Sequence, residues 1–334
     1  MAIDLLQIKR NNNYSIDNPN KEALRRLFRN KAAVIGIFII FILILTAIFA
    51  NLIMTHTYDK QSLREQNKVP YWVNIIFPSQ KDYAQVTKKH LIGTDSLGRD
   101  MFSRLVMGSR VSLTVAVFAP ILSLLIGIVF GSIAGYFGGK VDSIMMRIVD
   151  ILYAFPSLLF IILLMTFFKG ASNAEQGSFV YYVNQIDVKL NGILFIFVGI
   201  GLTSWQTMAR LTRAQVLSTK NKEYVEAARA LGATDKRIIF KHILPNVIGT
   251  LIVSETLAIP GYISTEAFLS FIGIGVNPPM PSWGAMISDG SKVIRSYPYQ
   301  AIFPAVILAL TMFAFNFLGD GLRDALDTRL KNLQ

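Results

Sequence analysis

Two carboxylates stand inside an otherwise uncharged, mostly apolar stretch of the chain. Glu255 and Glu266 are the only charged residues between positions 247 and 271. Charge is costly in hydrocarbon, so such residues usually face a protein interior or an aqueous path. Eleven residues are close to three helical turns, which places both side chains on one face. We expect that face to line a polar path through the protein and to offer hydrogen-bond acceptors to amine or amide groups that pass along it. The alternative is that Glu266 bonds neighbouring backbone near the helix end.

Other reactive groups are few. The chain has no cysteine, which excludes disulfides, thiolate metal sites and a cysteine nucleophile. Its three histidines, His56, His90 and His242, are scattered along the sequence, and from this spacing we expect no histidine-rich metal site. We therefore predict no catalytic residue, no metal site and no cofactor site in this chain.

A phosphate-binding loop is also missing from the sequence. The nearest candidate is Gly139-Lys140, and a Walker A motif needs a glycine six residues before the lysine and Ser or Thr after it. Those positions hold Ala134 and Val141. The chain is therefore predicted to carry no ATPase site of its own and not to be an enzyme.

The composition is that of a membrane protein. Hydrophobic residues make up 52% of the 334, charged residues make up 16%, and the mean hydropathy is +0.45. A soluble domain of this size would carry more charge, so we predict an all-α polytopic membrane protein in a lipid bilayer. The net charge of +12 comes from basic residues beside apolar runs, which is typical of membrane flanks and does not indicate nucleic acid binding.

Six transmembrane helices are predicted from the apolar segments. The first is too long for a signal peptide, lacks a clean cleavage site, and is expected to remain in the mature chain. At about 1.5 Å per residue, it is long enough to cross a hydrocarbon core of about 30 Å. The predicted spans are 32–54, 111–136, 148–168, 193–208, 247–271 and 301–318.

The basic residues predict the orientation. With six spans, the segments 1–31 and 321–334 and the loops after the second and fourth spans fall on one side, and all four are basic. By the positive-inside rule that side is the cytoplasm, so both termini are predicted to be cytoplasmic in a bacterial cell membrane. The segment 55–110 is also basic but is assigned to the outside, because long loops translocate largely regardless of charge. The five later helices then form a core over residues 111–320.

Small residues and prolines mark the predicted helices. Gly127, Gly131 and Gly135 share one face of the second span, where a neighbouring helix can approach closely. Packing within one bundle is favoured over a subunit interface. Pro156 in the third span and Pro260 in the fifth are each expected to interrupt the helical hydrogen bonds, as is tolerated beside a cavity or inside a protein.

A charged island, residues 223–246, lies between the fourth and fifth spans. Glu223 and Glu226 begin a helix-favouring stretch that Gly232 ends. A second helix is predicted from Asp235 to His242, ending before Pro245. Two short helices meeting at a glycine would form a compact projection for a soluble partner. The alternative is an amphipathic linker attracted to anionic lipid.

This island resembles the EAA loop of the membrane subunits of ABC importers, which their ATPase subunits grip. The matching pattern is Glu226-Ala227-Ala228, then Gly232, then Leu244-Pro245; His242 is a departure, because isoleucine often stands there. The resemblance implies that the ATPase-coupling residues are Glu223, Glu226, Ala227, Ala228, Gly232, His242, Leu244 and Pro245.

Further segments resemble the C-type permease subunits of dipeptide, oligopeptide and nickel importers. They are residues 90–104, 135–150, 268–275, 282–284 and 316–324, and the resemblance extends from about residue 21 to the end. It implies a type I ABC importer permease fold with a cytoplasmic coupling loop at 210–246. It also implies a homologous second permease, two cytoplasmic ATP-binding subunits, an extracytoplasmic substrate-binding protein and a peptide substrate.

Three alternatives fit parts of the sequence. A nickel importer permease belongs to the same family, although no predicted span contains histidine. An intramembrane enzyme would need a nucleophile with a base or a carboxylate dyad, and roughly 16 Å of helix rise separates Glu255 from Glu266. An ion-driven secondary transporter would usually show inverted repeats and several intramembrane charges.

Overall fold

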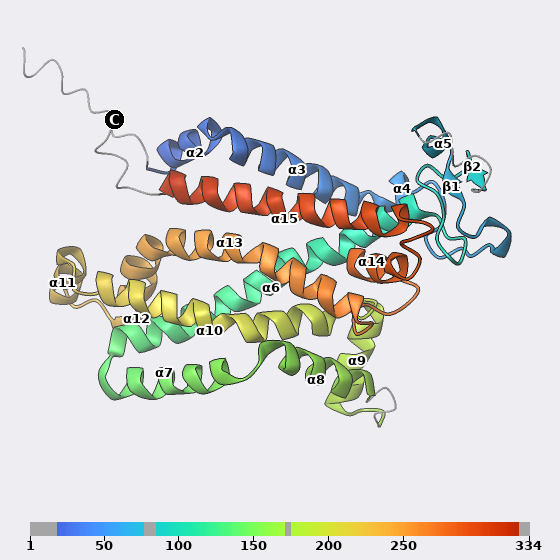
Figure 1. Cartoon of the computed structure of the whole chain (residues 1–334). Helices are drawn as coiled ribbons and strands as arrows, with labels where there is room; N and C mark the ends of the chain where they lie inside the picture. The colour runs from blue at the N-terminus through green and yellow to red at the C-terminus, as the bar shows by residue number, and fades with distance from the viewer. Residues whose placement is uncertain (1–18, 77–84, 171–174, 327–334) are drawn as a thin grey trace, which may run out of the picture.

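The protein is described here by a computed structural model, which covers residues 19–76, 85–170 and 175–326 (Figure 1). The predicted terminal segments 1–31 and 321–334 therefore lie partly outside the described residues. The elements in chain order are α2 (Pro19–Arg29), α3 (Lys31–Ile48), α4 (Ala50–Ile53), the 3₁₀ turn Leu63–Glu65, β1 (Val69–Pro70), α5 (Val73–Ile76), β2 (Val86–Thr87), α6 (Met101–Phe137), α7 (Gly139–Ala154), α8 (Ser157–Gly170), α9 (Phe179–Lys189), α10 (Leu194–Thr219), α11 (Glu223–Ala230), α12 (Asp235–Arg237), a π-helix (Ile238–Ile243), α13 (Leu244–Phe271), α14 (Trp283–Ser291) and α15 (Tyr299–Leu326).

Five helices of the described chain are long and apolar enough to cross a membrane, and a bent pair brings the number to six. The single helices are α3, α6, α10, the continuous helix 235–271 and α15. Four of them extend well beyond the predicted spans: α6 begins at Met101, α10 ends at Thr219, the helix 235–271 begins at Asp235 and α15 ends at Leu326. A hydropathy pattern marks only the apolar part of a helix, and polar extensions are held by caps. Asp100, for example, accepts a hydrogen bond from the backbone N–H of Ser103 at the start of α6.

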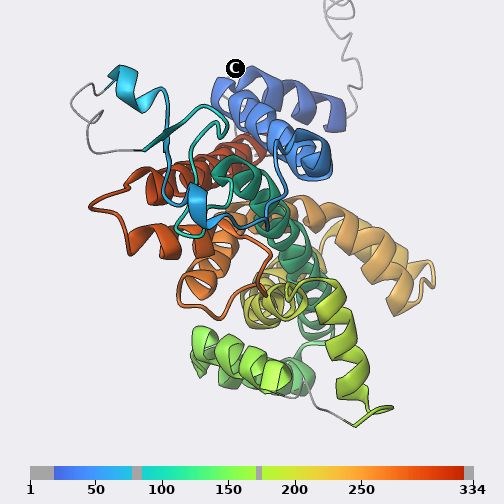
Figure 2. The same ribbon diagram turned by 90° about the vertical axis from the view of Figure 1, so that its right-hand side faces the viewer.

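The third predicted span is the bent pair, α7 and α8, whose axes differ by 79°. The break falls at Phe155 and Pro156. Proline lacks the N–H that would continue the helix, and it disfavours helical backbone in the residue before it. Phe155 accordingly has φ −80° and ψ 132°, an extended conformation. Figures 1 and 2 both show this pair on one side of the bundle, away from α2 and α3.

Pro260 leaves one hydrogen bond of the helix unmade, as any proline does, but it does not break the helix, because α13 continues through this residue. One missing hydrogen bond does not end a helix whose two halves are both held by packing. Leu251 on one side of Pro260 and Ile263 on the other are fully buried. Tertiary packing therefore outweighs the local preference at this position.

The glycine stripe on α6 packs against α10 of the same chain. A Cβ added at Gly127 would lie 2.6 Å from the Met208 Cβ, and one added at Gly131 would lie 2.4 Å from the Ala209 carbonyl oxygen. A Cβ at Gly135 would lie 2.9 Å from the Arg213 carbonyl oxygen. Each glycine therefore admits a backbone that a larger residue would exclude.

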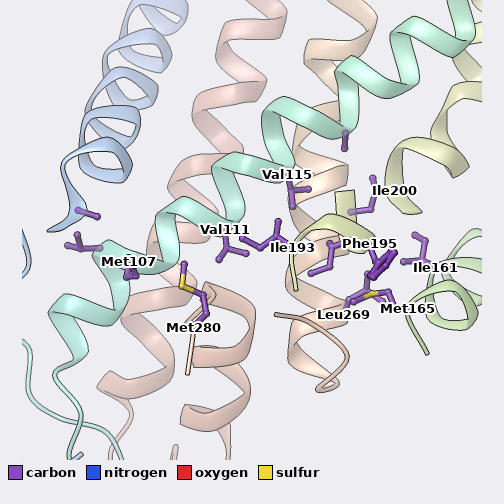
Figure 3. Packing of buried hydrophobic residues seen from close by; sticks show 14 residues of the cluster. Met107, Val111, Val115, Ile161, Met165, Ile193, Phe195, Ile200, Leu269 and Met280 are labelled. Carbon is purple, nitrogen blue, oxygen red and sulfur yellow. The ribbon is translucent and has the colours of Figure 1, made fainter. Parts of the chain in front are cut away.

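The largest buried cluster joins α6, α8, α10 and α13 (Figure 3). Val111 and Val115 come from α6, Ile161 from α8, Ile200 from α10 and Leu269 from α13, and all are almost fully buried. These contacts hold α8, the second helix of the bent pair, against the long helices. The core therefore holds α8 in place on the far side of the break that Pro156 causes.

The two ends of the bundle are built differently (Figure 1). One end carries α11, α2 and the last turns of α15. The other carries α5, α14 and the short parallel pair β1–β2, which is the only sheet within the described ranges. At this second end Asp95 accepts from the Arg99 Nε at 2.6 Å, and the Arg104 Nε lies 3.6 Å from the same carboxylate. The described residues 55–76 and 85–100 thus cap the start of α6.

We predict that Gly131→Ala destabilises the protein, because its Cβ would meet backbone that cannot move without separating α6 from α10. The expected loss is about 1–3 kcal/mol, as for overpacked cores, and it appears as a lower melting temperature in detergent. Gly261→Ala is the matched control, because an added Cβ there meets nothing within 4 Å. Equal melting temperatures for both variants would contradict the packing.

Candidate functional site

The first candidate site is the projection formed by α11, α12 and the π-helix, residues 223–243, which we call the α11 protrusion. The first turn of α11 carries Glu223 and Glu226, and its last turn carries Arg229. The helix dipole stabilises acidic residues at the start of a helix and basic residues at its end. Gly232 follows with φ +80°, a left-handed conformation that suits glycine. The chain therefore turns back sharply between α11 and α12.

One face of the α11 protrusion is buried. Val225 is fully buried and Ala228 is 8% exposed, and Val225 belongs to a cluster with Ile238, Ile243 and Val247. The cluster also includes Val216 on α10 and Leu251 on α13. Burying a valine or isoleucine side chain stabilises by about 1.5–3 kcal/mol. These contacts fix α11 against the end of α10 and the start of α13, which lie on either side of the protrusion in the chain.

The opposite face of the α11 protrusion is open. Glu223, Glu226 and Ala227 of α11 are exposed, and so are two large apolar residues elsewhere in the protrusion: Leu231 is 88% exposed and Phe240 is 66% exposed. Their exposure makes the protrusion a candidate contact surface. Leu231 and Phe240 were not among the predicted site residues; their signal in the sequence is an apolar residue within the charged island.

Ala228, one of the predicted coupling residues, does not share this open face. Residues 227 and 228 differ by about 100° around the helix axis, and Val225 fixes which of them points inward. Ala228 is therefore a packing residue of α11, whereas Ala227 presents its small side chain outward.

The second predicted helix of the island does not end before Pro245. The segment from Asp235 continues through the π-helix into α13, and Pro245 occupies the first turn of α13. A π-helix has a wider turn, and the Leu244 N–H bonds the Ile239 carbonyl oxygen five residues back. This register lets the chain pass the proline without a break. His242 and Leu244 are half-buried in this junction rather than fully exposed.

Polar contacts tie the base of the α11 protrusion to neighbouring helices. The Tyr136 hydroxyl at the end of α6 donates to Asp235 at 2.6 Å. Lys220 Nζ donates to the Gly135 carbonyl oxygen at 2.9 Å, where the last carbonyls of α6 favour a cation. Arg213 on α10 binds both carboxylate oxygens of Asp142 on α7, at 2.5 and 2.6 Å. The base of the protrusion is thus connected to α6, and α10 to α7.

The second candidate site is a pair of adjoining grooves beside the break between α7 and α8, with volumes of about 420 and 490 Å³. Ser157 and Thr203 line both grooves. Ser204, Gln206, Tyr262, Ser264 and Thr265 supply further neutral polar groups, and no charged residue of the described chain lines either groove. Volumes of this size are typical of small-ligand sites. We call this pair the hydroxyl groove.

The predicted path carboxylates lie inside the protein instead. Glu266 is fully buried and accepts from the hydroxyls of Ser112 at 3.0 Å and Ser270 at 2.8 Å. Glu255 is 4% exposed and accepts from the Tyr262 hydroxyl at 2.8 Å. The expected open face formed by both carboxylates is therefore absent here. Glu266 joins α13 to α6, and Glu255 orients Tyr262, which itself lines the hydroxyl groove.

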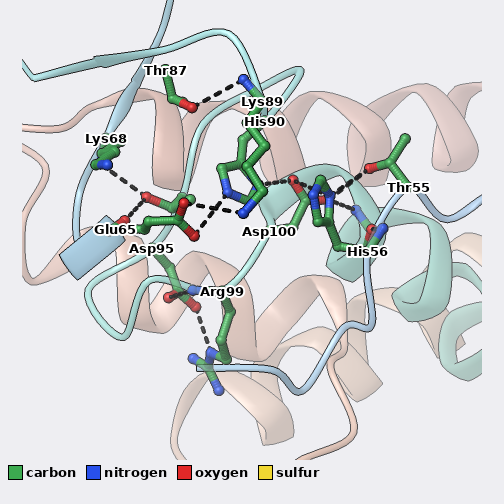
Figure 4. A network of polar contacts seen from close by, with 12 residues as sticks. Thr55, His56, Glu65, Lys68, Thr87, Lys89, His90, Asp95, Arg99 and Asp100 are labelled. Carbon is green, nitrogen blue, oxygen red and sulfur yellow. Dashed lines mark hydrogen bonds and ion pairs between the residues drawn. The ribbon is translucent and has the colours of Figure 1, made fainter. Parts of the chain in front are cut away.

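A third polar cluster lies at the opposite end of the molecule and brings together two histidines that are far apart in the sequence (Figure 4). The ring centroids of His56 and His90 are 4.5 Å apart, and His90 Nδ1 lies 2.7 Å from Asp100 Oδ1. His90 Nε2 faces Glu65 at 3.4 Å. Burial acts to raise the pKa of Glu65, but hydrogen bonds from Lys89 and His90 outweigh it and lower that pKa below its ordinary value. These groups lie together in the fold although His56 and Asp100 are 44 positions apart in the sequence.

Comparison with known proteins identifies the family. Residues 127–332 match the model of the binding-protein-dependent transport system inner membrane component, and residues 18–70 match the N-terminal TM domain of oligopeptide transport permease C. The chain is 43% identical to the oligopeptide transport system permease protein OppC of Bacillus subtilis, over 93% of this chain and 90% of that protein. It belongs to the binding-protein-dependent ABC permease family.

Other relatives agree with this assignment. The dipeptide transport system permease protein DppC of Bacillus subtilis is 42% identical, over 93% of this chain and 86% of that protein. The OppC protein of Escherichia coli strain K12 is 40% identical, over 92% of this chain and 91% of that protein.

A solved structure agrees with the fold. A chain from the inward-facing MetNI methionine ABC transporter aligns with a TM-score of 0.51 at 19% identity, covering 68% of this permease and 98% of that chain. The type I importer permease fold is therefore shown. The family match contains the α11 protrusion and the hydroxyl groove, and the two glutamates of α13 also fall within it.

Proposed function

We propose that this permease is the membrane subunit of an ATP-driven importer of oligopeptides or dipeptides. The observation that carries the proposal is the α11 protrusion, which presents an open face with Leu231 at its tip while its other face is fixed to the bundle. The relatives at 40–43% identity are permease proteins of oligopeptide and dipeptide transport systems. Together these findings support a transport subunit that receives its energy from a partner.

The proposed complex contains a second homologous permease, two ATP-binding subunits and an extracytoplasmic binding protein. The sequence supplies no Walker A motif, which supports a separate source of ATP hydrolysis. The α11 protrusion would bind an ATP-binding subunit through Leu231, Phe240 and the acidic residues of α11. The proposed orientation places this end, together with α2 and the end of α15, in the cytoplasm; the basic residues of the sequence support it.

The packing suggests how movement of the α11 protrusion reaches the transport path. Val225 and Ile243 belong to one buried cluster, and the π-helix joins α13 without a loop. A force on α11 would therefore move α13 as part of the same rigid unit. Tyr262 and Thr265 on α13 line the hydroxyl groove, so this motion would widen or narrow it.

The chemistry of the hydroxyl groove suits peptides of varied sequence. Hydroxyl and amide side chains can donate to or accept from the peptide backbone, which every substrate shares. A charged wall would instead favour or reject particular side chains. We infer that the groove, completed by the second permease, forms one wall of the path.

The first test concerns the α11 protrusion. Leu231→Asp places a charge where an apolar anchor is proposed, and loss of such an anchor typically costs about 2 kcal/mol or more of binding energy. The ATP-binding subunits should no longer co-purify with the tagged permease, and peptide uptake should fall with them. Leu63→Asp, at the opposite end and 77% exposed, should leave the retained ATP-binding subunits unchanged. Normal co-purification and uptake with Leu231→Asp would refute the docking role.

A second test concerns the hydroxyl groove. Thr203→Leu adds an apolar group where both grooves meet, and uptake should fall by roughly tenfold, the scale of one mismatched side chain in a substrate site. The ATP-binding subunits should remain bound. Thr46→Leu is the control, because Thr46 makes the same type of backbone hydrogen bond, on α3 at the other side of the bundle. Equal uptake by both variants would exclude Thr203 from the path.

A further inference from the structure

We propose that His56, His90 and Asp100 form a binding site for a divalent transition metal ion of the zinc class, at the end of the bundle opposite α11. One ligand atom from each of the three residues lies within 4.8 Å of the others. The residues come from three segments: the chain after α4, the loop after β2 and the N-cap of α6. Figure 4 shows the two imidazoles gathered around the Asp100 carboxylate.

The distances are close to those of a metal centre. In a tetrahedral zinc site with ligand bonds near 2.0–2.1 Å, neighbouring ligand atoms are roughly 3.3 Å apart. Asp100 Oδ1 lies 2.7 Å from His90 Nδ1 and 3.8 Å from His56 Nδ1. These two separations lie on either side of the required value. Side-chain rotations that bring the three ligand atoms, which all lie within 4.8 Å of one another, to this spacing would complete the geometry.

The surrounding groups hold the ligands as metal sites require. A histidine ligand commonly donates its other ring N–H to a carboxylate, which fixes the ring. His90 directs Nδ1 at Asp100 and Nε2 at Glu65, and Lys89 holds the second oxygen of Glu65 at 3.2 Å. Asp100 Oδ2 accepts from the Ser103 N–H at 2.7 Å, which leaves Oδ1 for the ion.

The donor set indicates the class of ion. Two imidazole nitrogens and one carboxylate oxygen suit zinc and its neighbours, whereas magnesium and calcium prefer sites made of oxygen alone. The side chains of His90 and Asp100 are 3% and 1% exposed, but that of His56 is 25% exposed. The ion would enter from solvent past His56 and keep one position open for water. Once bound, it would tie the segment 55–100 to the start of α6.

The test uses the complete transporter, purified through a tag that contains no histidine and stripped with a chelator. Zn²⁺ alone is titrated in competition with a chromophoric indicator, and bound zinc is counted by elemental analysis. The wild type should bind one zinc ion per permease chain, and the His56→Ala variant should not bind this ion. Glu65→Gln should retain the site but weaken its affinity by about 10–100-fold, as for other supporting carboxylates.

His242→Ala, which removes the remaining histidine of the chain, is the matched control and should bind zinc as the wild type does. His56→Ala keeps the buried contact of His90 with Asp100, and its melting temperature shows whether it folds. Identical zinc binding by the wild type and a folded His56→Ala variant would overturn the proposal. So would a wild type that takes up no ion at micromolar zinc.

Discussion

Val225 has no exposed surface, and its burial against the π-helix and α13 is the contact on which the rest of the functional arrangement depends. Without it, α11 would be a charged helix on a flexible connection, able to bind a partner but unable to move the bundle. With it, one face of α11 is part of the protein core and the other is free. The glycine at position 232, with φ +80°, allows the chain to turn back so that Ile238 and Ile243 can complete this contact. The proposed coupling requires a helix that has one face in the core and the other face free for a partner.

The same unit extends into the membrane through two further constraints. The π-helix carries the chain past Pro245 without a hinge, so α13 begins where the protrusion ends. The glycines of α6 allow α10 to pack at backbone distance, and Arg213 joins α10 to α7 through Asp142. The helices that border the hydroxyl groove are thus connected to the protrusion by buried contacts. The sharp break at Pro156 has a different effect from these rigid contacts. The extended backbone of Phe155 leaves the α7–α8 pair angled beside the hydroxyl groove. A rigid unit next to a broken helix can change the width of the space between them.

The sequence predicted the class of fold because apolar runs, basic flanks and the EAA-like pattern are local features. It could not predict where the helices end, since polar extensions of α6 and α15 depend on caps and neighbours outside the hydrocarbon. Pro260 showed that packing overrides a local breaker, whereas Pro156 showed the reverse where the preceding residue is free to extend. The direction of Ala228, the burial of Glu266 and the meeting of His56 with His90 are tertiary facts. Spacing along the chain contains no direct information about them. The exposed Leu231 could have been found from sequence, as an apolar residue that the amphipathic pattern of α11 does not require.

The most direct test of the account compares two adjacent positions on α11 in a chain that has no cysteine of its own. Ala227→Cys and Ala228→Cys are introduced separately into the assembled transporter, together with a cysteine at the facing surface of an ATP-binding subunit, and are treated with a short cross-linker. The account predicts an adduct from position 227, which faces outward, and little or none from position 228, which packs against the bundle. Equal adducts from both positions, or none from position 227 while the complex remains active, would contradict it.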